Sequence, residues 1–143
     1  MALSAGQIME YGEKKALSTI TGTTQSAVTT YLALPTAAPA TGADLTMASE
    51  TEFATTGGGY ARQPFLPGTP TSAAPSVLGN SATITFGPMT IAPGTTTWAI
   101  LTDTASGTGG NVIASFLLAN ARTPLVGDSL TAAGGAFTIS FTT

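Results

Sequence analysis

Two segments of this chain alternate between apolar and hydroxyl-bearing side chains, and this alternation limits the folds that the chain can adopt. Residues 81–86 read SATITF and residues 136–142 read AFTISFT. Successive side chains of an extended strand point to opposite faces, so each segment would have one apolar face and one face of threonine and serine. The pattern predicts two half-buried strands. Their inward side chains would be Ala82, Ile84 and Phe86 in the first, and Phe137, Ile139 and Phe141 in the second.

Further short apolar runs predict strands along most of the remaining chain, at residues 27–34, 59–65, 95–102 and 112–119. Residues 123–130 predict a short strand and a turn at Gly127-Asp128. Glycine- and proline-rich turns separate them, among them the hairpin loop DTASGTGGN at residues 103–111. About seven or eight short strands with a turn roughly every ten residues are typical of an all-β fold. We therefore predict a two-sheet antiparallel β-sandwich, of jelly-roll or Ig-like type, with a short N-terminal helix.

The helix is expected near the N-terminus, at residues 5–18. Ser4 followed by Gln7 fits a capping box at its start. Apolar side chains then recur with helical spacing, at Ile8, Tyr11, Ala16 and Ile20. We predict an N-terminal arm at residues 1–20 and a β-sandwich domain at residues 21–143. Because Gly12 weakens the helix by about 1 kcal/mol relative to alanine, the helix would need a partner surface, in its own domain or on another subunit.

The composition excludes several classes of partner. Charged residues make up 8% of the chain, the net charge is −3, and the basic residues are Lys14, Lys15, Arg62 and Arg122. Phosphate backbones are bound by many basic contacts, so we expect no nucleic acid. No apolar run approaches the roughly 20 residues that cross a membrane, and we expect no membrane partner. The first residues lack the basic-then-apolar order of a signal peptide, so we expect synthesis in a cytoplasm and use without processing.

Catalytic and metal-binding chemistry have few candidate groups. The chain has no histidine and no cysteine, which removes the commonest bases, nucleophiles and transition-metal ligands. Glu50 and Glu52 remain as a possible carboxylate pair, and Asp103, Ser106 and Asn111 as possible calcium ligands. Neither set has the surrounding residues that such sites carry. We therefore expect no enzyme, no catalytic residues, no cofactor and no metal ion.

The stretch GGGYARQPF at residues 57–65 is a candidate contact site. It is not a phosphate-binding loop, because no lysine with serine or threonine follows the glycines and Pro64 opposes a helix. One interpretation is structural: the glycines let a loop enter a sheet, and Arg62 binds the carboxylate of Glu50 or Glu52. The alternative is a contact with another subunit, since tyrosine and arginine are favoured at interfaces. The predicted interface residues are Ile8, Tyr11, Tyr60, Arg62 and Gln63.

Several segments, taken in order, resemble a family of small virion proteins of tailed bacteriophages, usually labelled phage tail fibre proteins. They are TTYLALPTAAP at 29–39, TEFATTGGGYARQPF at 51–65, SATITFGPMT at 81–90, TWAILTDTASG at 97–107 and VGDSLTAAGGAFTIS at 126–140. The resemblance spans nearly the whole chain. It implies a structural protein of the virion, made in the cytoplasm of the bacterial host.

The position within the virion is a separate prediction. A fibre usually has length, repeats or a coiled-coil stem, and this chain shows none of these. Its uncharged, hydroxyl-rich composition suits a surface covered by neighbours. We therefore predict a capsid decoration, or cement, protein that binds and stabilises the shell of the major capsid protein as a homo-oligomer, by analogy a trimer. The alternative is a tail fibre or a tail-associated receptor-binding component.

Overall fold

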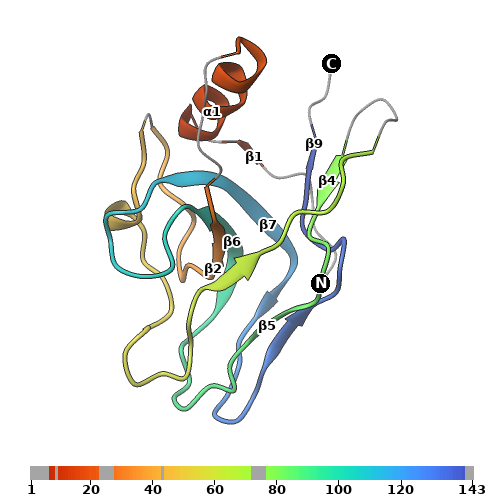
Figure 1. The fold of residues 1–143 in the computed structure, drawn as a ribbon. Coiled ribbons are helices and arrows are strands. Elements are labelled where there is room, and N and C mark those ends of the chain that lie inside the picture. Colours follow the sequence, from red (N-terminus) through yellow and green to blue (C-terminus); the bar gives the residue numbers. More distant parts are fainter. Residues whose placement is uncertain (1–6, 9, 23–27, 43, 72–76, 141–143) are drawn as a thin grey trace.

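The computed structural model describes residues 7–8, 10–22, 28–42, 44–71 and 77–140. In these parts the chain is mostly β with antiparallel pairing and one short α-helix, which confirms the predicted class (Figure 1). The elements follow the order β1 (Gln7–Ile8), α1 (Glu10–Ile20), β2 (Thr30–Ala33), the 3-10 turn η1 (Met47–Ser49), β3 (Gln63–Phe65), β4 (Val77–Gly79), β5 (Ile84–Phe86), β6 (Thr96–Thr102), β7 (Val112–Arg122), β8 (Leu130–Ala132) and β9 (Thr138–Ser140).

The strands of the described residues form one five-stranded sheet and two strand pairs. The sheet has the order β1-β7-β6-β2-β3, and the pairs are β4-β9 and β5-β8. The predicted two-sheet sandwich is therefore not confirmed, because the second layer is divided into separate short ribbons. Its strands are only three residues long. Prolines and positive-φ glycines, such as Gly87 and Gly135, interrupt the chain near their ends and limit the length of each ladder.

The alternating segments fill the core largely as predicted. Ile84, Phe86 and Phe137 are buried, while Thr85 faces solvent. Ala82 is exposed, contrary to the prediction, because it precedes the strand that begins at Ile84. The apolar run at 112–119 lies within β7, between β1 and β6, which confirms its central position.

Aromatic rings join the ribbons to the sheet. Phe116 of β7 meets Phe137 edge to face, with ring centroids 5.5 Å apart. Tyr60 stacks on Phe86 of β5 at 5.9 Å and meets Phe53 edge to face at 5.6 Å. Buried rings contribute large apolar areas, so these contacts hold together segments that share few backbone hydrogen bonds.

The N-terminal prediction needs a correction. The helix begins at Glu10 rather than residue 5, and Gln7 and Ile8 pair with Ser115 and Ala114 of β7. The backbone of these two residues pairs with the edge of β7. A local capping pattern does not reveal such a distant partner. Ser4 lies outside the described residues. Helix α1 packs against β7 with Gly12 buried, so its supporting surface lies in its own chain.

Other segments also differ from the prediction. The predicted short strand at 123–130 is absent: the chain turns at residues 126–127, and β8 begins only at Leu130. Strand β4 does not follow from any strand that the sequence predicts. Within the described parts of the chain, no helix has the length and apolar character needed to traverse a bilayer.

Candidate functional site

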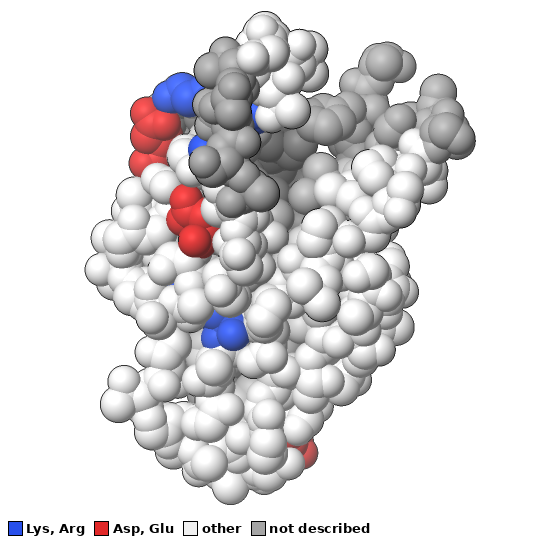
Figure 2. Space-filling model, viewed as in Figure 1, with Lys and Arg blue, Asp and Glu red and all other residues white. Residues whose placement is uncertain are grey.

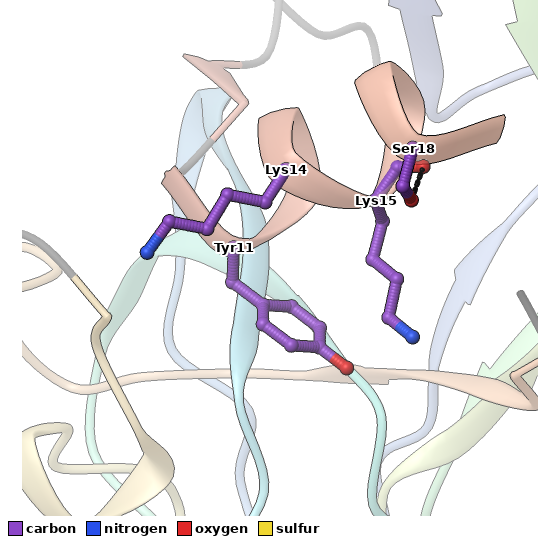
Figure 3. Close-up of a pocket in the computed structure, with 4 residues that line it drawn as sticks. All are labelled: Tyr11, Lys14, Lys15 and Ser18. Carbon is purple, nitrogen blue, oxygen red and sulfur yellow. Dashed lines mark hydrogen bonds between the residues drawn. The ribbon is translucent and has the colours of Figure 1, made fainter. Parts of the chain in front are cut away.

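One face of α1 forms a small pocket, which we call the α1 pocket (Figure 3). Its volume is about 240 Å³, and its lining residues are Tyr11, Lys14, Lys15 and Ser18. These positions are three or four residues apart, so they lie on one side of the helix. Figure 3 shows the side chains of Tyr11 and Lys15 extending from α1 in the same direction, with the Ser18 hydroxyl bonded to the Lys15 carbonyl at 2.9 Å.

Tyr11 lies near Asp103, the first residue of the 103–111 loop. Burial, followed by the Asp103 carboxylate, raises the pKa of Tyr11 above its ordinary value. Asp103 is itself held by Asn111, whose backbone N–H and side-chain Nδ2 each donate to its carboxylate at 2.7 Å. The loop thus closes on itself beside Tyr11.

Two lysines line the α1 pocket, and carboxylates lie beside them. Lys14 forms an ion pair with Asp44 at 2.8 Å, and both side chains are largely exposed. The Lys15 ammonium lies 5.7 Å from the centroid of the Tyr11 ring, at the distance of a cation–π contact. Figure 2 shows basic side chains at the upper end of the view beside acidic ones, and a further basic patch near its middle. The lining residues themselves contribute two positive charges and no negative charge.

The stretch GGGYARQPF leads to a second polar cluster, which is buried. The Arg62 guanidinium donates to the Glu52 carboxylate through Nε, at 3.1 Å to each oxygen, and through Nη2. Its nitrogens also donate to the carbonyls of Thr104 at 3.2 Å and Gly107 at 2.7 Å. The Arg62 side chain is 1% exposed and that of Glu52 15%. The structural interpretation is therefore confirmed, with Glu52 as the partner.

Tyr60 completes this cluster. Its hydroxyl donates to Glu52 at 3.1 Å and accepts the Leu34 N–H at 2.8 Å. Burial, and next the charge of Glu52, raise the pKa of Tyr60 far above its ordinary value. Glu50 is placed differently: it accepts the N–H of Ala40 at 3.1 Å, and burial raises its pKa. The two glutamates thus have separate partners and are not brought together as a carboxylate pair.

The five predicted interface residues lie in different environments. Tyr60 and Arg62 are buried and meet at Glu52, whereas Gln63 is half-buried and bonds the Ala61 carbonyl at 3.0 Å. Tyr11 lines the α1 pocket. Ile8 lies in β1, and its side chain is outside the described residues. Contact of these residues with another subunit stays a prediction.

Three loops are joined at the end of the molecule opposite α1, and we call them the loop end: residues 54–59, 87–95 and 123–129 (Figure 1). Met89 donates its N–H to the Asp128 carbonyl at 2.8 Å and accepts that of Gly127 at 2.7 Å. Thr90 donates to the Gly58 carbonyl at 2.9 Å. The turn at residues 125–128 is closed further by the Asp128 carboxylate, which accepts the Leu125 N–H at 2.9 Å.

This hydrogen-bonded framework displays aliphatic side chains. Ile91 is 44% exposed, Leu125 62% and Val126 66%. Figure 2 shows the lower end of the molecule almost entirely without charged side chains in that view. The sequence predicts the turn at Gly127-Asp128, which the structure confirms, but it places a short strand beside that turn and so gives no sign that Leu125 and Val126 are exposed.

The residues considered as possible calcium ligands make hydrogen bonds within their own loop. Asp103 and Asn111 bind each other, and the Ser106 carbonyl accepts the Thr104 hydroxyl at 2.9 Å. Across the residues that the structure describes, no group of three or more acidic, histidine or cysteine side chains could hold a metal ion.

The contacts above define a small antiparallel β protein with one short helix, a buried ion-pair cluster and an apolar loop end. The model of the family described as "Podophage GP4 fiber I protein gp80" matches residues 7–140. The chain therefore belongs to the Gp80 family and is a bacteriophage virion structural protein, which confirms the resemblance to phage tail fibre proteins. A search of curated proteins gives no match to the chain.

Proposed function

We propose that this protein is a structural component of a phage tail fibre. The observation that carries the proposal is the match of residues 7–140 to a family described by its fibre role. The predicted capsid decoration role, with the major capsid protein as partner, has no support in that match, and the tail-fibre alternative fits the family description better.

The proposal includes docking through the loop end. Ile91, Leu125 and Val126 are exposed on a backbone that is fixed by hydrogen bonds between loops. Rigid exposed apolar groups lose little freedom when they bind, and contiguous apolar surface typically marks contact sites. Asp128 is the one charged residue in the sequence of these three loops, so a copy of the same surface meets a single like charge. Copies of this chain are the proposed partner, in the predicted trimer.

A non-enzymatic role is part of the same proposal. Support comes from the carboxylates, because Glu52 is bound to Arg62 and Tyr60 and Glu50 to a backbone N–H. A catalytic pair needs two carboxylates that face one substrate. Incubation with host surface polysaccharide should release no reducing ends, and release that Glu50→Gln abolishes would contradict the proposal.

The position in the virion can be tested directly. Gold-labelled antibodies against the chain, viewed by electron microscopy on intact phage, are expected to mark the tail. Labels spread over the capsid shell would refute the fibre proposal and restore the decoration role. Virions that lack the protein should keep the heat resistance of their capsids, because a fibre component does not bridge capsid subunits.

A further inference from the structure

We propose that copies of this chain meet at the loop end in one register, in which Arg122 of one copy binds the Asp128 carboxylate of its neighbour. The inference rests on the proposed function, because docking through the loop end is part of it. It adds the pair of residues that specifies how two copies fit together. An apolar contact has no preferred direction, whereas a pair of opposite charges fixes the relative position of two surfaces.

Arg122 is a cation without a partner in its own chain. Arg62 and Lys14 each bind a carboxylate. The structure gives the Arg122 guanidinium neither a hydrogen bond nor an ion pair with a described residue, although the residue is half-buried. Arginine is enriched at protein interfaces, where its planar guanidinium binds carboxylates through two parallel hydrogen bonds. Its charge is therefore available to a neighbouring copy.

The strand pairing places Arg122 where the sheet joins the loop end. Arg122 is the last residue of β7 and lies opposite Thr96, the first residue of β6. Directly beyond this pair, the hydroxyls of Thr95 and Thr123 share a hydrogen bond of 2.7 Å. The backbone on the loop side of Arg122 is therefore fixed, and the residue borders the surface that is proposed to dock.

Asp128 supplies the complementary charge. Its residue is exposed within the loop end. The Oδ2 atom of its carboxylate accepts the Leu125 N–H at 2.9 Å, and this bond holds the carboxylate beside the exposed aliphatic side chains. The Oδ1 atom accepts no hydrogen bond from the described residues, and no ion pair joins Asp128 to Arg122 within one chain. The carboxylate can therefore accept a donor from another copy.

Symmetry favours pairing between unlike residues of the two copies. If identical loops met head on, the two Asp128 carboxylates would face each other and repel. An offset brings Arg122 of each copy to Asp128 of the other in a dimer, or of the next copy in the predicted trimer. Each copy contributes one cation and one anion, so every pair in a closed assembly is satisfied.

The experiment is a double-mutant cycle on the association constant of the full chain, measured by analytical ultracentrifugation at several concentrations. Arg122→Gln removes the cation, and Asp128→Asn removes the carboxylate but keeps an acceptor for the Leu125 N–H. Each single variant should weaken association about ten-fold, and the double variant should be no weaker than either one. Arg122→Asp, which sets two carboxylates against each other, should weaken association about 100-fold.

Glu13→Gln is the matched control. Glu13 is exposed on α1, at the other end of the molecule, and it also has no hydrogen bond or ion pair with a described residue. Its replacement removes one unpaired charge and should leave the association constant unchanged. Added salt should weaken the association of the parent more than that of the double variant, because salt screens charge pairs.

The sign of the Asp128→Asn effect separates the two registers. If Asp128 faced Asp128, removal of the charge would strengthen association, and this result would overturn the proposal. Additive losses in the double variant, or an unchanged association constant in either single variant, would overturn it as well. Urea denaturation at a dilution where the parent is monomeric should give equal stability for all variants. A large loss of stability there would place the effect inside one chain and contradict the inference.

The outcome is separable from that of the fibre proposal. If the two charges are coupled but antibody labels mark the capsid, the pair stands and the fibre function falls. If labels mark the tail, and Leu125→Ser with Val126→Ser disrupts an assembly that Arg122→Gln leaves intact, the fibre function and the docking stand and the pair falls. A parent chain that stays monomeric at all concentrations would refute the docking and the pair together.

Discussion

Arg62 and Glu52 form an ion pair inside the protein, and the same guanidinium binds the carbonyls of Thr104 and Gly107. One side chain thus joins the chain before β3 to the hairpin loop between β6 and β7. The Glu52 carboxylate also accepts the Tyr60 hydroxyl. Breaking a buried ion pair is costly because the remaining charge keeps no partner, so this cluster should dominate the effects of substitution in its region.

Replacement of Arg62 by alanine should lower the free energy of unfolding by about 3–5 kcal/mol, because it leaves the Glu52 carboxylate without its buried cation. Urea denaturation measures the loss. Arg122→Ala serves as the control and should cost less than about 0.5 kcal/mol. Equal losses in the two variants would show that the buried pair adds nothing to stability.

Removal of the Tyr60 hydroxyl should leave Glu52 and the Leu34 N–H each without one partner. Tyr60→Phe is therefore expected to cost about 1–3 kcal/mol at neutral pH. The parent protein should also lose stability above pH 10.0, which is the ordinary pKa of tyrosine. The reason is that the raised pKa of Tyr60 keeps its hydroxyl protonated in the folded protein, whereas the same hydroxyl ionises in the unfolded chain. The free energy of unfolding, measured at increasing alkaline pH, should fall less steeply in Tyr60→Phe than in the parent. Identical slopes of this free energy against pH would contradict the prediction.

The effect of Glu50 on the pH dependence of stability should be opposite to that of an ion-paired carboxylate. Burial raises its pKa above 4.5, so the folded protein binds the proton more readily and loses stability as the pH rises through the folded-state pKa. Glu50→Gln keeps an acceptor for the Ala40 N–H without the charge. The melting temperature of this variant should exceed that of the parent at pH 7 and approach it at pH 4; a lower value at pH 7 would disprove the account.

Gly59 should be the least replaceable glycine of the GGGYARQPF stretch. Its φ is 70°, and an added Cβ would lie 2.3 Å from the Pro88 carbonyl oxygen and 2.8 Å from the Thr90 nitrogen. Gly94 also has a positive φ, 97°, but a Cβ there would meet open space. Gly94→Ala should cost about 1–2 kcal/mol from its backbone conformation alone. Gly59→Ala should cost clearly more in the same denaturation experiment, and similar losses would mean that the loops can separate easily.

Polar substitution of the loop end should change assembly and not folding. The double variant Leu125→Ser with Val126→Ser removes exposed side chains, so its stability should stay within about 0.5 kcal/mol of the parent. Analytical ultracentrifugation should show that this double variant has a smaller mass in solution than the parent oligomer. Leu17→Ser with Ile20→Ser is the matched control, because it removes two exposed aliphatic groups from α1 at the other end. A parent chain that is monomeric, or equal masses for both variants, would refute docking through the loop end.

The sequence predicted those parts of the fold that depend on local pattern. The burial of Ile84, Phe86 and Phe137 follows from alternation, and the central place of β7 from its apolar faces. Gln7 pairs with Ser115 at the edge of β7, which is far away in the sequence. The helical spacing of apolar residues around Gln7 therefore predicted a helix where the structure has a short strand. The sandwich prediction was not confirmed because strand number alone does not say which strands pair.

The sequence predicted part of the buried ion-pair cluster and little of the α1 pocket. The pairing of Arg62 with a nearby glutamate was anticipated because few charges are present, but its bonds to the carbonyls of Thr104 and Gly107 were not. Lys14 and Lys15 were noted only as basic residues. The closeness of Tyr11 to Asp103 depends on how α1 packs, and no local pattern reports that contact.

The framework of the loop end is built from backbone N–H and carbonyl groups of Met89, Gly127, Asp128, Thr90 and Gly58. The outward side chains of Ile91, Leu125 and Val126 take no part in those bonds. A phage lineage can therefore exchange these three residues without disturbing the scaffold beneath them. If the loop end docks as proposed, single substitutions there would change the contacting side chains and leave the backbone shape of the surface as it is.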